Sequence, residues 1–239
     1  MVTARQIDHI RTGVGFVGNV ISFGLFLSPA PTFWKIHKKG AVEDFSPNPY
    51  LATILNCVLW VYYGLPFVHP HDTLVITING VGIGIELIYV CIFLIYATKK
   101  GRCYVLSVFA GEAVFYAAVV LLLTLEPNCI ANRSMIIGIL CDIFNILMYA
   151  MPLDNLYQVY KSKSSYFMPK YLLLFNALNG GCWLAFALLR FDIYLLVSNG
   201  LGFVLGLIQI GVWWWYRNGP KPEDKIDDEA VKAKELSMV

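Results

Sequence analysis

Seven stretches of about 20 mostly apolar residues run through the chain, and they limit its possible folds more than any other feature. A helix of that length crosses roughly 30 Å of hydrocarbon and keeps its backbone hydrogen bonds within itself. The stretches do not alternate apolar and polar residues, as the strands of a membrane barrel would. Only 14% of the residues are charged, against roughly 25% in soluble domains. The sequence therefore predicts an all-α membrane protein with seven transmembrane helices, at residues 10–34, 49–68, 73–97, 104–125, 135–158, 169–189 and 193–216.

Lysine and arginine residues gather on one side of the predicted membrane. They follow the first, third, fifth and seventh apolar stretches, whereas the opposite side carries few of them. Since cytosolic loops are enriched in these residues, we expect the N-terminus outside or in a lumen and the C-terminus in the cytosol. The tail at 217–239 is charged and is predicted to be disordered. The small net charge of +2 gives no sign of a nucleic-acid partner.

The second half of the chain repeats the first. Matches between polar or helix-breaking residues are informative, because such residues are uncommon inside apolar helices. The offset between matched residues is 120 over the second and third helices of each copy and 123 over the first helix. The matched pairs are Pro49 with Pro169, Asn56 with Asn176, Asp72 with Asp192, and Asn79 with Asn199 at the first offset, and Pro29 with Pro152, Ser22 with Asn145, and Leu25 with Met148 at the second.

The repeat defines the predicted domain organisation. Residues 10–97 and 131–216 each form a three-helix repeat, and residues 98–130 supply a linker helix and an outer loop. Three crossings bring the chain to the opposite side of the membrane, so a fourth is needed before the second copy has the orientation of the first. We therefore predict two parallel three-helix bundles joined by a linker helix (3+1+3), related by an axis along the membrane normal.

Several short motifs, in order and partly repeated, resemble the plant-type SWEET (MtN3/saliva) family between Gly13 and Tyr216. The resemblance implies facilitated, bidirectional transport of a small-molecule sugar without a cofactor. It also implies a homo-oligomer surrounded by membrane lipids, in either the plasma membrane or the vacuolar membrane. The motifs are Phe26-Leu27-Ser28-Pro29, Asn48-Pro49-Tyr50, Tyr63-Gly64-Leu65-Pro66, Thr77-Ile78-Asn79-Gly80, Ala150-Met151-Pro152, Phe167-Met168-Pro169 and Ser198-Asn199-Gly200.

Two asparagines are the foremost candidates for sugar binding. Asn79 and Asn199 lie at matching depth in their helices, where a buried carboxamide without partners costs several kcal/mol. An amide both donates and accepts hydrogen bonds, which suits sugar hydroxyls, but the same group also joins neighbouring transmembrane helices. The residues alone leave both interpretations open, and the resemblance implies contact with the sugar.

The resemblance implies further residues around the same pocket. Trp183 is expected to stack on a sugar ring, and its repeat equivalent at offset 120 is Tyr63. Trp60 departs from relatives that carry a small serine there, so we expect it to narrow the pocket. Leu25 and Met148, which are of middle-to-large size, favour a glucose-like monosaccharide over a disaccharide. The remaining expected pocket residues are Ser22, Asn56, Asn145 and Asn176.

Four prolines are candidate hinges for an intracellular gate, as the resemblance implies. A proline inside a helix removes a backbone hydrogen bond and kinks the helix. For Pro49 and Pro169, the alternative is a proline in the first helical turn, where no hydrogen bond is lost. The four are Pro29, Pro49, Pro152 and Pro169.

Other polar residues are expected near the outer ends or deep in the helices. The resemblance implies that Tyr63 and Asp192 form an extracellular gate, and the alternative is that Asp192 caps its helix in solvent. Three acidic residues lie deepest in the apolar stretches, and none has an acidic partner in the repeat. We expect these three, Glu86, Glu112 and Asp142, to make structural hydrogen bonds.

Two other functions remain open. A proton-coupled sugar symporter would share the fold but needs a titrating group at the sugar. A seven-helix receptor would share the number and orientation of the helices, but it predicts neither the repeat nor the very short loops. No metal-ligand cluster, phosphate-binding loop or activated nucleophile stands out, so we predict neither an enzyme nor a metal site.

Overall fold

The computed structural model describes residues 3–166 and 168–220. Most of the predicted tail, residues 221–239, therefore lies outside the described residues. The described part is all-helical, as predicted, and contains no strand. Its helices, in chain order, are α1 (Ala4–Leu27), α2 (Ala30–Lys39), α3 (Asn48–Tyr63), α4 (Thr73–Tyr96), α5 (Lys99–Leu125), α6 (Pro127–Ala131), α7 (Arg133–Leu147), α8 (Ala150–Ser162), α9 (Lys170–Leu188) and α10 (Ile193–Tyr216).

The first and fifth predicted helices are each interrupted once. The first breaks at Pro29, between α1 and α2, and the fifth breaks at Met148, between α7 and α8. A proline has no N–H to donate to the carbonyl four residues earlier. For Pro29 this carbonyl belongs to Leu25, and for Pro152 it belongs to Met148. Each break therefore lies within the turn that ends at a proline.

Six helical segments of the described chain are long and apolar enough to cross a membrane, when α1 with α2 and α7 with α8 are each counted as one. The seventh is α3, whose 16 residues rise about 24 Å. We predicted that this helix would run to residue 68, but it ends at Tyr63. Gly64 follows, and a Cβ there would lie 3.2 Å from the carbonyl oxygen of Asp72, so the chain turns closely against the start of α4.

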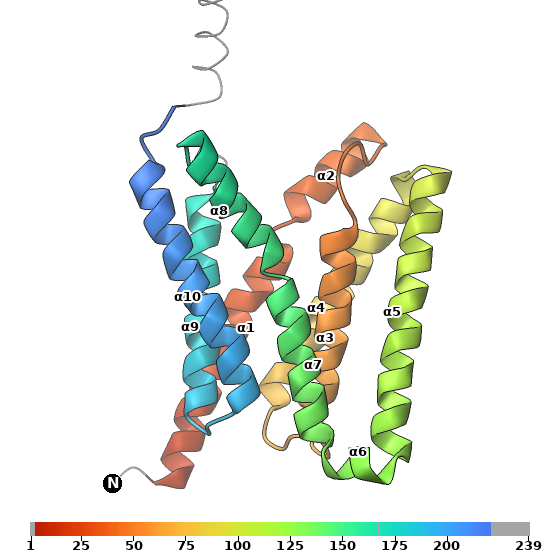
Figure 1. Cartoon of the computed structure of the whole chain (residues 1–239), viewed down its shortest axis with the longest axis vertical. Helices are drawn as coiled ribbons and strands as arrows, with labels where there is room; N and C mark the ends of the chain where they lie inside the picture. The colour runs from red at the N-terminus through yellow and green to blue at the C-terminus, as the bar shows by residue number, and fades with distance from the viewer. Residues whose placement is uncertain (1–2, 167, 221–239) are drawn as a thin grey trace, which may run out of the picture.

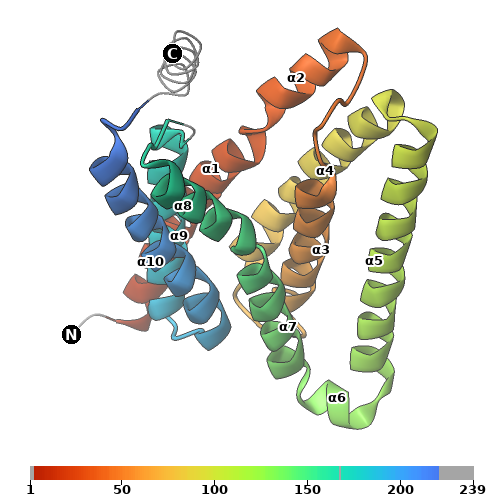
Figure 2. The same ribbon diagram turned by 45° about the horizontal axis from the view of Figure 1, so that its top comes forward.

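Six of the spanning segments form a closed ring. In each repeat the third helix lies between the first and the second, since α4 packs on α1 and α3, and α10 packs on α7 and α9. The repeats meet where α1 packs on α9 and where α3 packs on α7. The linker helix α5 lies outside the ring against α3 and α4, away from α9 and α10 (Figure 1 and Figure 2).

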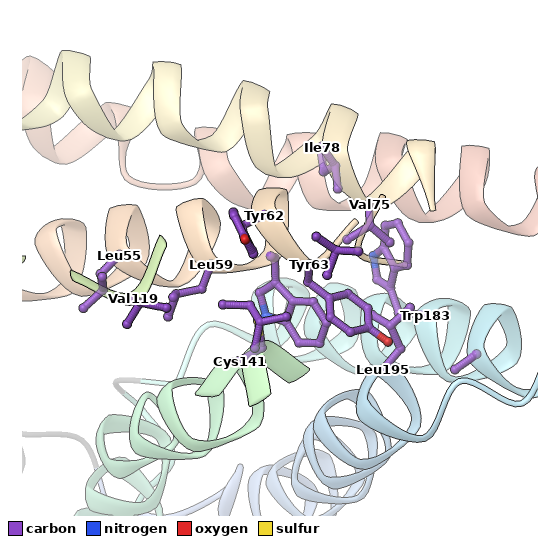
Figure 3. Close-up of a cluster of buried hydrophobic side chains, with 14 of the residues drawn as sticks. Leu55, Leu59, Tyr62, Tyr63, Val75, Ile78, Val119, Cys141, Trp183 and Leu195 are labelled. Atoms are coloured by element: carbon purple, nitrogen blue, oxygen red, sulfur yellow. The ribbon is translucent and has the colours of Figure 1, made fainter. Parts of the chain in front are cut away.

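The two ends of the ring differ, and we name them after the short helices that mark them in Figure 1. At the α6 end, beside the N-terminus, one hydrophobic core joins the two repeats (Figure 3). At the α2 end each repeat has a core of its own, one between α2, α3, α4 and the linker helix α5, and one between α8, α9 and α10. The repeats are therefore packed together at the α6 end and stand apart at the α2 end.

Candidate functional site: a cavity between the repeats

A cavity of about 840 Å³ lies inside the ring, between the two repeats. It reaches the surface at the α2 end, where the exposed residues Ser46 and Asn48 line it. Neither Tyr63 nor Asp192, at the α6 end, lies in its wall. The volume falls within the range of roughly 300–1,000 Å³ that is typical of small-molecule sites. The cavity is thus open towards one end of the ring and closed towards the other.

The wall of this cavity contains all ten predicted substrate-binding residues. They come from both repeats and from every helix of the ring, although they are widely separated in sequence. They are Ser22, Leu25, Asn56, Trp60, Asn79, Asn145, Met148, Asn176, Trp183 and Asn199.

Asn79 and Asn199 have matching environments. The amide of Asn79 donates to the carbonyl of Val75 at 2.8 Å, and the amide of Asn199 donates to the carbonyl of Leu195 at 2.9 Å. Each acceptor lies four residues earlier in the same helix, and within the described residues neither side chain bonds to another helix. One amide hydrogen and the oxygen of each side chain are left for a ligand.

The indole of Trp183 is held in place by a short polar chain. Its Nε1 donates to the hydroxyl of Ser22 at 3.1 Å, and this hydroxyl donates to Oδ1 of Asn179 at 2.6 Å. A Cβ on Gly18 would lie 3.2 Å from the indole, so the glycine lets α1 approach the ring closely. The orientation of Trp183 at the cavity wall is therefore set before any ligand arrives.

Aromatic contacts favour a repeat offset of 123, rather than 120, in α3 and α9. Trp60 packs edge-on against Tyr63, and Trp183 packs edge-on against Phe186, both with ring centroids 5.3 Å apart. Trp60 is therefore the equivalent of Trp183, and Tyr63 is the equivalent of Phe186. This pairing replaces the predicted equivalence of Tyr63 with Trp183. That prediction aligned Pro49 with Pro169, but Pro49 lies inside α3 whereas Pro169 precedes α9.

Asn179 is a polar cavity residue that was not among the predicted ones. It lines the cavity and accepts the hydrogen bond from Ser22. The offset of 123 matches it with Asn56, so extending that offset from the first helix into the second would have found it. Oδ1 of Asn56 is buried and has no hydrogen-bond partner among the described residues, which leaves it available to a ligand.

Two polar contacts close the α6 end. The hydroxyl of Tyr63 donates to Asp192 at 2.8 Å, and Figure 3 shows the Tyr63 ring reaching from α3 towards Leu195 of α10. The second contact lies at the equivalent place in the other repeat, where Phe186 replaces Tyr63 and has no hydroxyl to donate. There the Arg11 guanidinium lies 3.7 Å from the centroid of the Phe186 ring and pairs with Asp72 at 2.5 Å. Asp192 also accepts from two backbone N–H groups at the start of α10, so it caps that helix, but in a buried setting rather than in solvent.

The same end holds a cluster of possible metal-binding groups. The relevant atoms of His69, Asp72 and Asp192 lie within 4.8 Å of one another. However, Arg11 already pairs with Asp72, so only one of the two negative charges is left without a positive partner. A divalent ion would bring two positive charges and would leave the cluster with an excess of positive charge. We therefore assign no metal to this cluster.

The four prolines fall into two classes. Pro29 and Pro152 accompany the helix breaks, and both line the cavity. Pro49 also lines it but is the second residue of α3, where a missing N–H costs no helical bond. Pro169 is exposed, lies outside the cavity wall and immediately precedes α9. The alternative of a proline at a helix start therefore fits Pro49 and Pro169.

The three deep acids differ in their environments. Asp142 accepts a hydrogen bond from Ser198 of α10, in keeping with the structural role we expected. Glu86 instead lines the cavity, and its Oε2 is buried without a hydrogen-bond partner among the described residues. Oε2 of Glu112, on α5, is likewise unpaired within the described part. A structural hydrogen bond is thus found for Asp142 alone of these three.

The chain is similar to known sugar transporters over most of its length. A family model described as "Sugar efflux transporter for intercellular exchange" matches residues 12–101 and again residues 135–221. The chain is 49% identical to the bidirectional sugar transporter SWEET7b of Oryza sativa subsp. indica, over 97% of this chain and 89% of that protein. It is 47% identical to SWEET5 of Arabidopsis thaliana, over 95% and 93%. The 3.7 Å resolution structure of a eukaryotic SWEET transporter aligns with a TM-score of 0.83 at 33% identity, over 88% of this chain and 98% of that one.

Proposed function

Because this chain belongs to the SWEET family and is a membrane-embedded sugar transporter rather than an enzyme, we propose that it is a facilitative, bidirectional uniporter for glucose-like monosaccharides. The observation that carries the proposal is the cavity, which both repeats line with neutral polar groups and aromatic rings. It opens at the α2 end and is closed at the α6 end. Such one-sided access is what transport by alternating access requires.

The free groups of the cavity suit sugar hydroxyls. Asn79 and Asn199 each keep an amide hydrogen and an oxygen for a ligand, and Asn56 has an unpaired oxygen. Trp60 and Trp183 supply flat apolar faces of the kind that C–H groups of a sugar ring pack against. Neutral hydrogen bonds contribute only about 0.5–1.5 kcal/mol each, so a sugar held by a few of them binds weakly enough to leave again.

The size of the substrate is inferred from the bulky residues of the wall. Leu25 and Met148 both line the cavity, at the turns where the first and fifth transmembrane segments break. Trp60 adds a large ring where some relatives carry a serine. These side chains support a single hexose as the preferred cargo over a disaccharide.

The gates are proposed to work alternately. In the present conformation the bond between Tyr63 and Asp192 closes the α6 end. Opening that end would part this pair and bring α2 and α8 together over the other end of the cavity. The breaks at Pro29 and at Met148, one turn before Pro152, are suitable hinges, because bending there disrupts little helical hydrogen bonding.

The proposed orientation follows from charge. The α2 end carries Lys38, Lys39 and Lys161, together with Lys99 and Lys100 at the start of α5, so we place it in the cytosol. The N-terminus and the closed α6 end then face the outside or a lumen. Apolar side chains exposed on α5 fit contact with lipid or with a second copy in a homo-oligomer.

A proton-coupled symporter is the second candidate, and Glu86 is the observation that favours it. This carboxyl lines the cavity and has an unpaired oxygen. It lies seven residues from Asn79, or about 10 Å along α4, which is too far for one monosaccharide to contact both unless the helix bends. The other groups that we assign to the sugar are uncharged, so uniport is the better-supported mechanism.

Purified protein in sealed vesicles, assayed with a panel of labelled mono- and disaccharides, tests the proposal. A uniporter should show counterflow of labelled glucose and equal final concentrations on both sides, with no accumulation when a proton gradient is imposed. Accumulation that disappears in Glu86→Gln would overturn uniport and support symport. Absence of transport for every sugar in the panel would contradict the proposed function itself.

A further inference from the structure

His69 lies where the outer carboxylates of the two repeats meet. It belongs to the turn between α3 and α4, and its Nδ1 is 2.6 Å from Oδ2 of Asp72 and 3.8 Å from Oδ2 of Asp192. Its ring stacks on Tyr63, with centroids 4.8 Å apart and planes inclined by 18°. One imidazole thus touches the gate pair of Tyr63 and Asp192 and also reaches the carboxylate that pairs with Arg11.

The charges around His69 do not balance when its ring is neutral. Arg11, from α1, brings one positive charge to the two carboxylates of Asp72 and Asp192. These side chains are 0% and 1% exposed, and Oδ2 of Asp192 has no hydrogen-bond partner among the described residues. A buried charge without compensation is costly. A proton on His69 supplies the one positive charge that the cluster lacks.

We propose that His69 is a further gating residue, whose protonated ring ties Asp72 of the first repeat to Asp192 of the second and whose deprotonation loosens the closed gate. The proposal rests on the transport function proposed above and adds a regulator to the same gate. The His69 side chain is 29% exposed, so protons reach it from the α6 side. Since the proton is taken up and released on that one side, it changes the rate of transport and does not drive accumulation.

The electrostatics of the cluster support this role. The hydrogen bond to Asp72 raises the pKa of His69, Asp192 and Asp72 raise it further through their charges, and burial and Arg11 oppose the rise. Burial raises the pKa of Asp192 as well. Both shifts favour one extra proton in the closed cluster.

The direction of the pH effect follows from the raised pKa of His69. When the gate opens and the carboxylates separate, the pKa of His69 returns towards its ordinary value of about 6.5. The proton therefore stabilises the closed gate fully below that value, and the stabilisation is lost as the pH rises through the pKa of the closed form. Opening of the α6 end should become easier with increasing pH.

Sugar counterflow in vesicles with equal pH on both faces tests the proposal between about pH 5 and 8, the range in which histidine titrates. Wild-type exchange should rise several-fold with pH, and by no more than about tenfold per pH unit for one ionisation. His69→Gln, which cannot take up the proton, should flatten the profile. His69→Lys, which stays charged, should be flat and slow. The control His71→Gln, at an exposed residue two positions away, should keep the wild-type profile.

A second readout does not depend on sugar. Thr53 lines the cavity, so in a background without reactive native cysteines Thr53→Cys should react with a membrane-impermeant thiol reagent from the α6 side only when the gate opens. Labelling should increase with pH, and adding His69→Gln should remove the increase. Sugar transport with pH-independent counterflow and labelling would overturn the role of His69 alone. Labelling that depends on pH and His69 in a protein that moves no sugar would contradict only the transport proposal.

Discussion

The amides of Asn79 and Asn199 are each half satisfied by their own helices, through bonds to the carbonyls of Val75 and Leu195. This arrangement fixes the side chains without using the groups that face a ligand. It also explains how two strongly polar side chains are tolerated at depth, because each side chain has one hydrogen bond satisfied within its own helix.

Asn79→Ala and Asn199→Ala should therefore each weaken sugar exchange. Loss of one neutral hydrogen bond, about 0.5–1.5 kcal/mol, should raise the KM for glucose roughly two- to twelvefold in counterflow assays. Asn132→Ala, at the exposed start of α7, serves as the matched control. Wild-type kinetics in both cavity variants would remove the pair from the site.

Met148→Ala should relax the preference for small sugars. The substitution removes most of a side chain from the cavity wall, so sucrose exchange should increase relative to glucose exchange in the same vesicles. Met135→Ala, at an exposed position on α7, should leave the ratio unchanged. Robust sucrose transport by the unmodified protein would count directly against the assignment of Leu25 and Met148 as the size-limiting pair.

At the scale of helices, the breaks that follow α1 and α7 divide the first and fifth transmembrane segments into two halves each, and the proposed gating requires these halves to move relative to each other. Pro29→Ala or Pro152→Ala would restore an N–H that is able to bond to Leu25 or Met148 and would stiffen the joint. Each variant should lower the maximal exchange rate several-fold with little change in KM. Pro169→Ala should have a smaller effect, because that proline is exposed and precedes its helix. Equal losses in all the variants would show that the prolines do not act as hinges.

The sequence was sufficient to predict the transmembrane segments, because long apolar stretches mark them, and which faces meet in the cavity, because polar residues within those stretches mark the faces. It was not sufficient to align α3 with α9, since Pro49 lies inside its helix and Pro169 lies before its helix. The resulting error of three residues is close to one helical turn, so it kept the same face. Asn56 matches Asn176 at the offset of 120 and Asn179 at the offset of 123, and for this reason both line the cavity.

The contacts that close the α6 end were largely beyond prediction from the sequence. Arg11 of α1 pairs with Asp72 at the start of the neighbouring helix α4, and neither residue was predicted to have this partner. His69 lies on the short turn between α3 and α4, where no sequence pattern indicates a role for it. These pairings depend on how α1 packs against α4 and, for Asp192, on how the second repeat meets the first, which local patterns do not encode.

For the molecule as a whole, the two repeats share a core at the α6 end and keep separate cores at the α2 end, so access to the cavity is one-sided. Thr53→Cys, in a background without reactive native cysteines, should therefore react quickly with an impermeant thiol reagent applied from the α2 side and slowly from the α6 side. Thr12→Cys, at an exposed site on α1 near the N-terminus, should show the opposite preference. Equal reactivity of Thr53→Cys from both sides would mean that the conformation with a closed α6 end is not the resting one.

Leu25 and Met148 belong both to the cavity wall and to the backbone turns at which the transmembrane segments bend. If these two side chains set the size of the sugar, as proposed, a substitution there that admits a larger sugar also alters the joint that is proposed to move during transport. The two proposals together therefore couple selectivity to transport rate. Natural variants that change the transported sugar through these positions are then expected to change the transport rate as well. Engineered variants with a wider cavity there need to be screened for transport rate in addition to specificity.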